Sequence, residues 1–230
     1  IALAKLALNL PAEKIWNKYQ EYGLGLRPEL TFPGVASGKV RPYKRWRSIE
    51  QATMAYGYGL STSLLQIAQV YTAYAGDGTL HPATLLADVD PATGVDLGPD
   101  EANPLRPGTR VTTPATAAQM RAMLEMAVGQ GGTGRAAQVA GYRVGGKTGT
   151  ARKQAGTSYA KNKYRSLFVG MAPMSDPRII VAVMIDEPSG RGFYGGTVAG
   201  PVFSSVAGGT LQLFGVPPDL AEMVQADGKS

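Results

Sequence analysis

A cluster of glycines inside a predicted β-strand constrains this fold more than any other feature. After Tyr142 and Val144 the sequence runs Gly145-Gly146-Lys147-Thr148-Gly149-Thr150, which supplies three glycines, one ammonium group and two hydroxyls. Glycine weakens the interior of a strand, and a cluster of glycines there indicates that a ligand or another backbone comes close. A lysine and two threonines beside such a bare backbone could bind an anionic group along the strand edge. An ordinary glycine-rich turn into a strand is the alternative that this stretch alone leaves open.

Hydrophobic spacing predicts helices before this stretch, and two further strands and a helix after it. We expect strands over residues 142–152, 164–172 and 178–186, with residues 173–177 as a turn between the last two. Such a turn favours an antiparallel pair. Helices are predicted over residues 1–8, 11–22, 63–75, 113–128 and 197–214.

Several features of these elements follow from local signals. The alanines and leucines of residues 1–8 predict the end of a buried helix, and the methionines at 120, 123 and 126 are expected to face the core. Ser48 to Gln51 is typical of a capping box, and Thr62 of a helix N-cap. Residues 80–89 are predicted to be extended, 91–108 to form a surface excursion, and 189–196 a mobile loop.

Composition excludes several classes of site. The 230 residues are 44% hydrophobic and 17% charged, which suits one globular domain with a sizeable core. The absence of cysteine rules out disulfides and thiolate metal sites, and the single histidine, His81, cannot form a histidine-rich metal site. The apolar runs fall short of the roughly 20 residues that a membrane-spanning helix needs.

The net charge of +6 raises the possibility of a nucleic-acid or membrane partner. Basic residues gather with aromatic ones in a single stretch, which consists of Lys39, Arg41, Tyr43, Lys44, Arg45, Trp46 and Arg47. Pro42 and the glycines before it predict an irregular loop here, and not a helix that could read a groove. We therefore interpret the stretch as a solvated loop.

A long series of ordered motifs identifies a family. The motifs are Ala55 to Ser61, Gly146 to Lys153, Tyr164 to Gly170, Ile185 to Pro188, Tyr194-Gly195-Gly196 and Pro201 to Phe203. Together they resemble the transpeptidase domain of class B penicillin-binding proteins, and most closely the division-specific peptidoglycan D,D-transpeptidases. The resemblance implies an α/β (α+β) penicillin-binding protein/β-lactamase-like fold, an antiparallel sheet flanked by helices. Residues 1–216 would be the C-terminal part of that domain, and residues 217–230 a disordered polar tail.

The resemblance also implies that this chain holds only part of an active site. The family uses Ser-x-x-Lys, then Ser-x-Asn, then Lys-Thr-Gly, and only the third motif stands in its expected place, at Lys147 to Gly149. The nucleophile and the second motif are therefore expected before Ile1, with no nucleophile in this chain. Ser158 and Lys161 match the spacing of Ser-x-x-Lys, but they lie between predicted strands and not at a helix start, so we interpret the match as chance. A non-catalytic penicillin-recognising sensor or scaffold remains the alternative.

Residue roles carry over by position. The resemblance makes Lys147, Thr148, Gly149 and Thr150 the catalytic residues of this chain. Lys147 would set the electrostatics of the serine–lysine pair, the two threonines would bind the substrate carboxylate, and Gly149 would leave room for the acyl group. The Thr150 backbone N–H would complete the oxyanion hole. Substrate-binding residues at the cleft rim would be Arg152, Tyr164, Phe193 and Tyr194, for whose aromatic rings ordinary packing is the alternative.

The biological setting is likewise implied by the family. The substrate would be the D-Ala-D-Ala stem peptide of peptidoglycan, cross-linked through a serine acyl-enzyme during septal cell-wall synthesis, with β-lactams as inhibitors. No cofactor, metal or nucleic acid is expected. Partners would be a glycosyltransferase and divisome proteins. The location would be the periplasmic face of the bacterial inner membrane, with contact to the membrane only through an N-terminal anchor absent from this chain.

Overall fold

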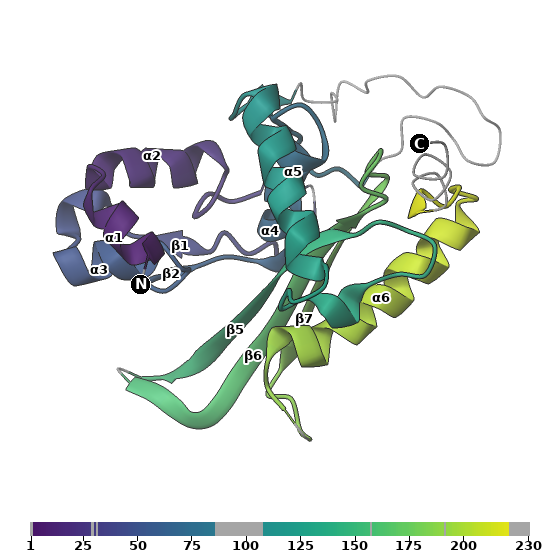
Figure 1. The fold of residues 1–230 in the computed structure, drawn as a ribbon. Helices are drawn as coiled ribbons and strands as arrows, with labels where there is room; N and C mark the ends of the chain where they lie inside the picture. The colour runs from purple at the N-terminus through teal and green to yellow at the C-terminus, as the bar shows by residue number, and fades with distance from the viewer. Residues whose placement is uncertain are drawn as a thin grey trace. The chain divides into compact units, whose positions relative to one another are not determined.

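The chain folds into two compact units, which are described separately below. The computed structural model describes residues 2–220 except 29, 31, 86–107, 157 and 191 (Figure 1). One unit comprises residues 1–70 and 79–111, and the other comprises residues 71–78 and 112–230. The predicted surface excursion lies outside the described residues except for its last position, and so do residues 86–89 of the predicted extension. Within residues 80–85 only Leu80 belongs to a strand.

The first unit is mainly helical. Its helices are α1 (Ala2–Leu8), α2 (Ala12–Glu21), η1 (Tyr43–Arg45), α3 (Ser48–Met54) and the first part of α4 (Leu64–Ala75). Two short antiparallel pairs complete it: β1 (Lys39–Val40) with β2 (Leu60–Ser61), and β3 (Thr79–Leu80) with β4 (Thr109–Arg110). The helix predicted over residues 1–8 is confirmed, but its burial is not. Leu3, Leu6 and Leu8 are 48–59% exposed, and Ala7 is the buried residue of α1.

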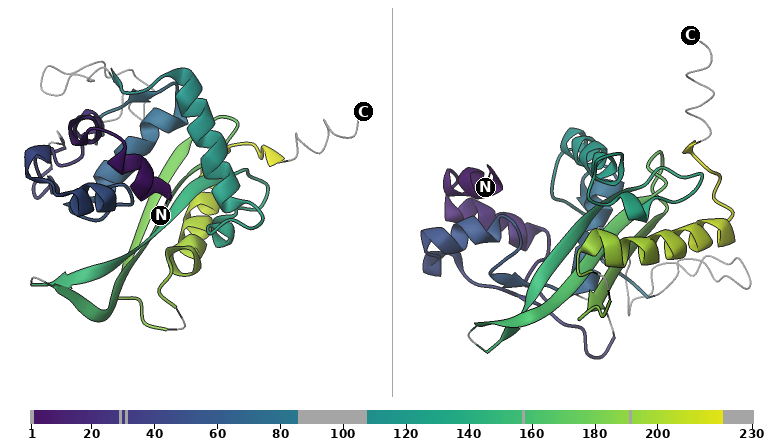
Figure 2. Two further views of the ribbon diagram at one scale, coloured as in Figure 1. Left: turned by 60° about the vertical axis from the view of Figure 1, so that its left-hand side comes forward. Right: turned by 60° about the horizontal axis from the view of Figure 1, so that its bottom comes forward.

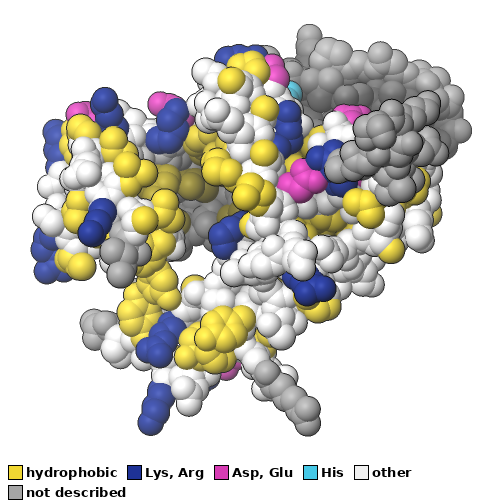
Figure 3. All heavy atoms as spheres, in the orientation of Figure 1, with side chains coloured by type: hydrophobic (Ala, Val, Ile, Leu, Met, Phe, Trp, Pro, Cys, Tyr) yellow, Lys and Arg dark blue, Asp and Glu magenta, His cyan; other side chains and the backbone are white. Residues whose placement is uncertain are grey.

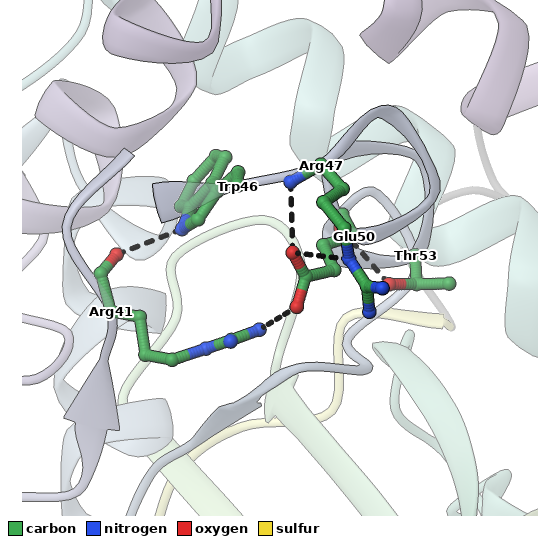
Figure 4. Close-up of polar contacts among 5 residues, drawn as sticks. All are labelled: Arg41, Trp46, Arg47, Glu50 and Thr53. Atoms are coloured by element: carbon green, nitrogen blue, oxygen red, sulfur yellow. Dashed lines mark hydrogen bonds and ion pairs between the residues drawn. The ribbon is translucent and has the colours of Figure 1, made fainter. Parts of the chain in front are cut away.

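The basic loop is tied to the start of α3 by Glu50 (Figure 4). The Glu50 carboxylate accepts the backbone N–H of Arg47 at 2.8 Å and pairs with the Arg41 guanidinium at 2.6 Å. Arg47 is therefore the N-cap of α3, and the predicted capping box at Ser48 is wrong by one residue because the acidic partner is Glu50. These contacts hold the pKa of Glu50 at about 2, below its ordinary 4.5, first through the Arg47 N–H and then through Arg41.

The start of α4 carries a second reciprocal cap. The backbone N–H of Gln66 donates to the Ser63 hydroxyl at 3.2 Å, and the backbone N–H of Ser63 donates to Gln66 Oε1 at 3.0 Å. Ser63, and not Thr62 as predicted, is thus the capping residue. The Gln66 amide is buried and also lies within hydrogen-bonding distance of the carbonyls of Gly23, Leu26 and Ser37. One side chain therefore joins the start of α4 to the loop after α2.

A three-stranded antiparallel sheet forms the centre of the second unit. Its strands are β5 (Gly145–Ala155), β6 (Ser158–Ala172) and β7 (Ile179–Asp186), in the order β5-β6-β7. Helix α6 (Gly195–Leu213) lies along one face of this sheet (Figures 1 and 2). The core between them includes Phe168 and Phe203, whose rings meet edge to face at 4.8 Å between centroids. The three strands and the C-terminal helix were predicted, and the helix begins two residues earlier than expected.

Cross-strand register places the site residues on one face. Thr148 pairs with Phe168, and Thr150 pairs with Ser166. Side chains that face each other across an antiparallel pair share a face of the sheet, and alternate residues of a strand do so too. Thr148 and Thr150 therefore project on the same side as the buried Phe168, which is the side that α6 covers.

The hairpin of β5 and β6 continues beyond the third strand. β7 pairs with β6 only from Arg165 to Ala172, whereas β5 and β6 also pair at Tyr164 and, after a register shift that leaves residues 160–163 outside the ladder, at Tyr159 and Ser158 (Figures 1 and 2). The hairpin turns at Gly156, whose φ of 62° lies in the left-handed region that suits glycine. β6 begins six residues before the strand predicted at 164, so Ser158 and Lys161 lie on β6 and not between strands as expected.

Helix α5 (Pro114–Val128) packs against β5, but not through its methionines. The Thr113 hydroxyl accepts the backbone N–H of Thr116 and caps the helix, which begins one residue after the predicted start. Ala117, Leu124 and Val128 are the buried positions. Met123 and Met126 are 55% and 74% exposed, so the prediction that the methionines form a core stripe is wrong. Figure 3 shows hydrophobic side chains on the surface of α5.

The chain beyond Pro217 is better ordered than predicted as far as Leu220. Asp219 is 5% exposed, and its carboxylate accepts the backbone N–H groups of Arg143 at 2.7 Å and Ser175 at 3.1 Å. The backbone N–H of Leu220 donates to Gly141. These contacts attach the end of the described chain to the segment that leads into β5, while residues 221–230 of the predicted tail lie outside the described part.

Candidate active site

Lys147 is the exposed charge of the site. Its ammonium group bends back along β5 and donates to the Thr148 carbonyl at 3.0 Å and to Thr148 Oγ1 at 3.3 Å. In the part of the chain that the structure describes, no carboxylate lies within ion-pairing distance of this ammonium group. The site therefore carries one positive charge that the described chain leaves unneutralised, next to a hydroxyl.

Thr148 has a second hydroxyl partner, Thr133. The two Oγ1 atoms lie 3.0 Å apart, and either can be the donor. Thr133 lies in the segment between α5 and β5 and was not among the residues that the sequence singled out. A Cβ on Gly196, at the start of α6, would lie 2.1 Å from the Thr133 carbonyl oxygen and 3.2 Å from the Thr148 methyl.

The Thr150 hydroxyl is held by the first turn of α6. It accepts the backbone N–H of Gly195 at 3.0 Å. A Cβ on Gly195 would lie 2.2 Å from the Leu167 carbonyl oxygen and 2.3 Å from that of Gly149, closer than real Cβ contacts. Only glycine lets the helix start reach the strand at this point.

The glycines of β5 differ in what they accommodate. A Cβ on Gly145 would lie 2.6 Å from the sulfur of Met174, and one on Gly146 would lie 2.5 Å from the Phe168 ring. The Cβ on Gly146 would also lie 2.7 Å from the Val169 carbonyl oxygen, so packing within the chain requires glycine there, whereas the Met174 side chain could shift to make room at Gly145. Gly149 is different, because its nearest neighbour would be an ordinary contact of 3.5 Å to Leu167. The atoms of this chain do not require glycine at 149, so a need for it would come from something bound there.

The four predicted rim residues lie together on the same face. The Tyr164 and Phe193 rings stack at 4.0 Å between centroids, and Phe193 contacts the Tyr194 ring at 4.6 Å. The Arg152 guanidinium lies over the Tyr164 ring at 5.8 Å from its centroid. Tyr194 is 64% exposed, so packing alone does not account for its ring. The structure thus brings the four rim residues together, from β5, β6 and the loop before α6, and places one of them, Arg152, on the strand that carries Lys147 to Thr150.

A charge cluster flanks the site on the neighbouring strands. Lys153 pairs with Asp186 and with Glu187, each at 2.7 Å, and Arg165 pairs with Asp186 at 3.1 Å. The hydrogen bond from Lys153 is the main cause that lowers the pKa of both carboxyls, and it raises the pKa of Lys153. Lys153 is thereby neutralised, in contrast to Lys147.

Two negative findings complete the description. Across residues 2–220, with the gaps given above, no group of three or more histidine, cysteine, aspartate or glutamate side chains could hold a metal ion. Nor is any helix in that range both long enough and apolar enough to cross a membrane.

Comparison with known proteins defines the class. Residues 1–208 match the family model described as the penicillin-binding protein transpeptidase domain. The chain therefore belongs to the penicillin-binding protein transpeptidase family, and its helices and antiparallel sheet have the predicted α+β fold.

Individual relatives carry the comparison further. The chain is 43% identical over 219 residues to the probable peptidoglycan D,D-transpeptidase PenA of Neisseria meningitidis, covering 95% of this chain and 35% of that protein. It is 35% identical over 219 residues to the peptidoglycan D,D-transpeptidase FtsI of Escherichia coli, with the same coverage of both. The solved transpeptidase domain of Burkholderia pseudomallei penicillin-binding protein 3 is 51% identical. It superposes with a TM-score of 0.83, over 94% of this chain and 62% of that one. The chain thus spans about a third of the length of these curated relatives.

Proposed function

We propose that this chain supplies the strand-edge half of the active site of a peptidoglycan D,D-transpeptidase. The observation that carries the proposal is the constellation on β5. An ammonium group unneutralised by the described chain, Lys147, stands beside two hydroxyls, Thr148 and Thr150, next to a backbone left bare at Gly149. This arrangement suits a peptide that lies along the strand and ends in a carboxylate. The names of the relatives support the same reaction.

Each group then has a defined task in acyl transfer. The Thr148 and Thr150 hydroxyls bind the terminal carboxylate of a D-Ala-D-Ala stem peptide, and hydrogen bonds to a charged group are stronger than neutral ones. Lys147 stabilises negative charge near the reacting serine. The Thr150 backbone N–H stabilises the oxyanion of the tetrahedral intermediate. Arg152, Tyr164, Phe193 and Tyr194 hold the rest of the substrate, and β-lactams react at the same serine.

The attacking serine is proposed to lie in a segment outside this chain. Ser158 and Lys161 cannot replace it, because both lie on strand β6. At about 3.3 Å per residue, three positions along an extended strand separate the Cα atoms by about 10 Å, whereas one helical turn rises about 5.4 Å. A lysine at that distance cannot take the serine proton as it could one helical turn away.

The cellular setting is proposed from the relatives. We place the enzyme on the periplasmic face of the inner membrane, in septal synthesis during cell division, with a glycosyltransferase and divisome proteins as partners. A non-catalytic sensor or scaffold is the competing function.

Labelling by a fluorescent penicillin tests the proposal. The 230 residues alone should remain unlabelled, whereas the protein in which they are joined to a preceding Ser-x-x-Lys segment should form a covalent adduct. Labelling of the 230 residues that Ser158→Ala abolishes would contradict the placement of the serine.

A second measurement separates the two functions. The complete enzyme should release D-alanine from a pentapeptide stem and join the product to an acceptor amine. Acylation by penicillin without that release would favour the sensor.

A further inference from the structure

Ser166 is a buried hydroxyl to which no role has been assigned so far. Its exposed fraction is 0%, and its Oγ donates to the Phe193 carbonyl at 2.5 Å. It stands on β6 directly opposite Thr150 on β5, so the two side chains share one face of the sheet. Ser166 thus joins the strand to the loop that carries the aromatic rim, one strand away from the threonine expected to bind the carboxylate.

The same loop determines which way the Thr150 hydroxyl points. Two residues after Phe193, the backbone N–H of Gly195 donates to Thr150 Oγ1 at 3.0 Å. A hydroxyl has one proton to donate and two lone pairs to accept with. The Gly195 N–H occupies one lone pair, and among the described residues no acceptor receives the Thr150 proton. Thr150 is therefore left as a donor, which is the role that binding a carboxylate requires.

The position of Gly195 depends on two constraints. The first is steric, because its backbone sits so close to the Leu167 and Gly149 carbonyls that no Cβ fits there. The second is the Ser166–Phe193 hydrogen bond, which fixes the chain just before the helix starts. Without that bond the half-buried Phe193 carbonyl would lose its partner, and the loop would move to satisfy it. Such a movement would carry the Gly195 N–H away from Thr150.

We propose that Ser166 is a positioning residue that, through Phe193 and Gly195, holds the Thr150 hydroxyl as a donor to the substrate carboxylate. This inference rests on the proposed function, because it assumes that Thr150 binds that carboxylate. Ser166 itself does not touch the substrate.

The test compares two probes on the complete enzyme. One is a fluorescent penicillin, and the other is the methyl ester of the same compound, which lacks the carboxylate charge. Ser166→Ala should slow acylation by the acid about tenfold, a change equivalent to about 1.4 kcal/mol. Acylation by the ester should change less than about twofold. Ser166→Thr keeps the hydroxyl and should restore most of the rate for the acid.

Ser204→Ala is the matched control. The Ser204 hydroxyl also donates to a backbone carbonyl, that of Gln138 at 2.6 Å, and lies on the same helix that Gly195 begins. Its bond is exposed, so its removal should lower the unfolding temperature by less than Ser166→Ala does, and it should leave both acylation rates unchanged.

The outcomes are distinct. Equal losses for acid and ester in Ser166→Ala would show a merely structural role and overturn the inference, as would a Ser204→Ala enzyme with the same probe discrimination. A Ser166→Ala protein that fails to fold, together with a Ser166→Thr protein that still loses the acid-specific rate, would also overturn it. If the unsubstituted enzyme is not acylated by either probe, the proposed function fails, and this inference fails with it.

Discussion

At the scale of single residues, the site is an arrangement of hydroxyls whose partners come from distant parts of the sequence. Thr148 contacts Thr133, fifteen positions earlier, and Thr150 accepts from Gly195, forty-five positions later. The sequence predicted Thr148 and Thr150 through their motif. It could not predict Thr133, Ser166 or Asp219, because one polar residue in a loop, strand or tail carries no sign of the carbonyl or N–H that it will meet.

Thr150→Val should slow acylation of the complete enzyme more than Arg152→Ala does. Valine keeps the shape of threonine but removes a hydrogen bond to a charged group, which is worth about 1.5–3 kcal/mol, so the rate constant should fall roughly ten- to a hundredfold. Stopped-flow acylation by a chromogenic β-lactam measures the effect, with Thr150→Ser as the control that keeps the hydroxyl. Equal rates for Thr150→Val and the unsubstituted enzyme would exclude Thr150 from the carboxylate site.

Glu50 should make folding stability depend on pH at the acid end. Its pKa is about 2 in the folded chain, below the ordinary 4.5, so its stabilisation is complete above about pH 4.5 and is lost as the pH falls towards 2. Glu50→Gln should therefore lower the unfolding midpoint at pH 6, and the difference from the unsubstituted protein should shrink as the pH falls.

Thr53→Val provides the comparison for that experiment. The Thr53 hydroxyl donates to the Glu50 backbone carbonyl at 2.9 Å and leaves the carboxylate untouched. Its effect on the midpoint should be the same at pH 6 and pH 3. A Glu50→Gln difference that stays constant over that range would mean that the ion pair contributes nothing.

At the scale of elements, long strands and helices were predicted well, while caps and buried faces were not. The strand and helix signals extend over many residues, so small errors average out. Caps depend on one side chain, and both predicted caps that were wrong, at Ser48 and Thr62, lie one residue from the true ones. The prediction that the methionines of α5 face the core failed for a different reason. Their spacing places them on one face of the helix, but it does not show which face other elements cover.

Helix α5 offers a direct test of its buried face. Leu124→Ala removes a side chain that is 8% exposed, and should cost about 2–5 kcal/mol of unfolding free energy. Met126→Ala removes a side chain that is 74% exposed, and should change the stability by about 0.5 kcal/mol or less. Urea unfolding measures both. Comparable losses of unfolding free energy for the two variants would mean that the methionines of α5 are packed in the core after all.

At the scale of the whole molecule, the fold was predicted from the order of helices and strands along the chain. Helices, then three strands and a final helix occur in the expected sequence, and the matches of residues 1–208 to the family model agree with that order. The division into two compact units was not foreseen, because composition and length suggested one domain and contain no information on which segments contact each other.

Because β6 is longer than β7, we expect the two ends of the sheet to unfold locally at different free energies. From Arg165 to Ala172 each residue of β6 has a neighbour on both sides, and the Tyr164 carbonyl still accepts the backbone N–H of Glu187 just after β7. Beyond Tyr164, β6 pairs only with β5, at Tyr159 and Ser158, after a register shift that leaves residues 160–163 outside the ladder. Opening the outer hairpin breaks one ladder, and opening the inner part breaks two, so the two parts should differ in local unfolding free energy. Uniform amide deuterium exchange along β6 would show that the hairpin tip is held by contacts other than the sheet.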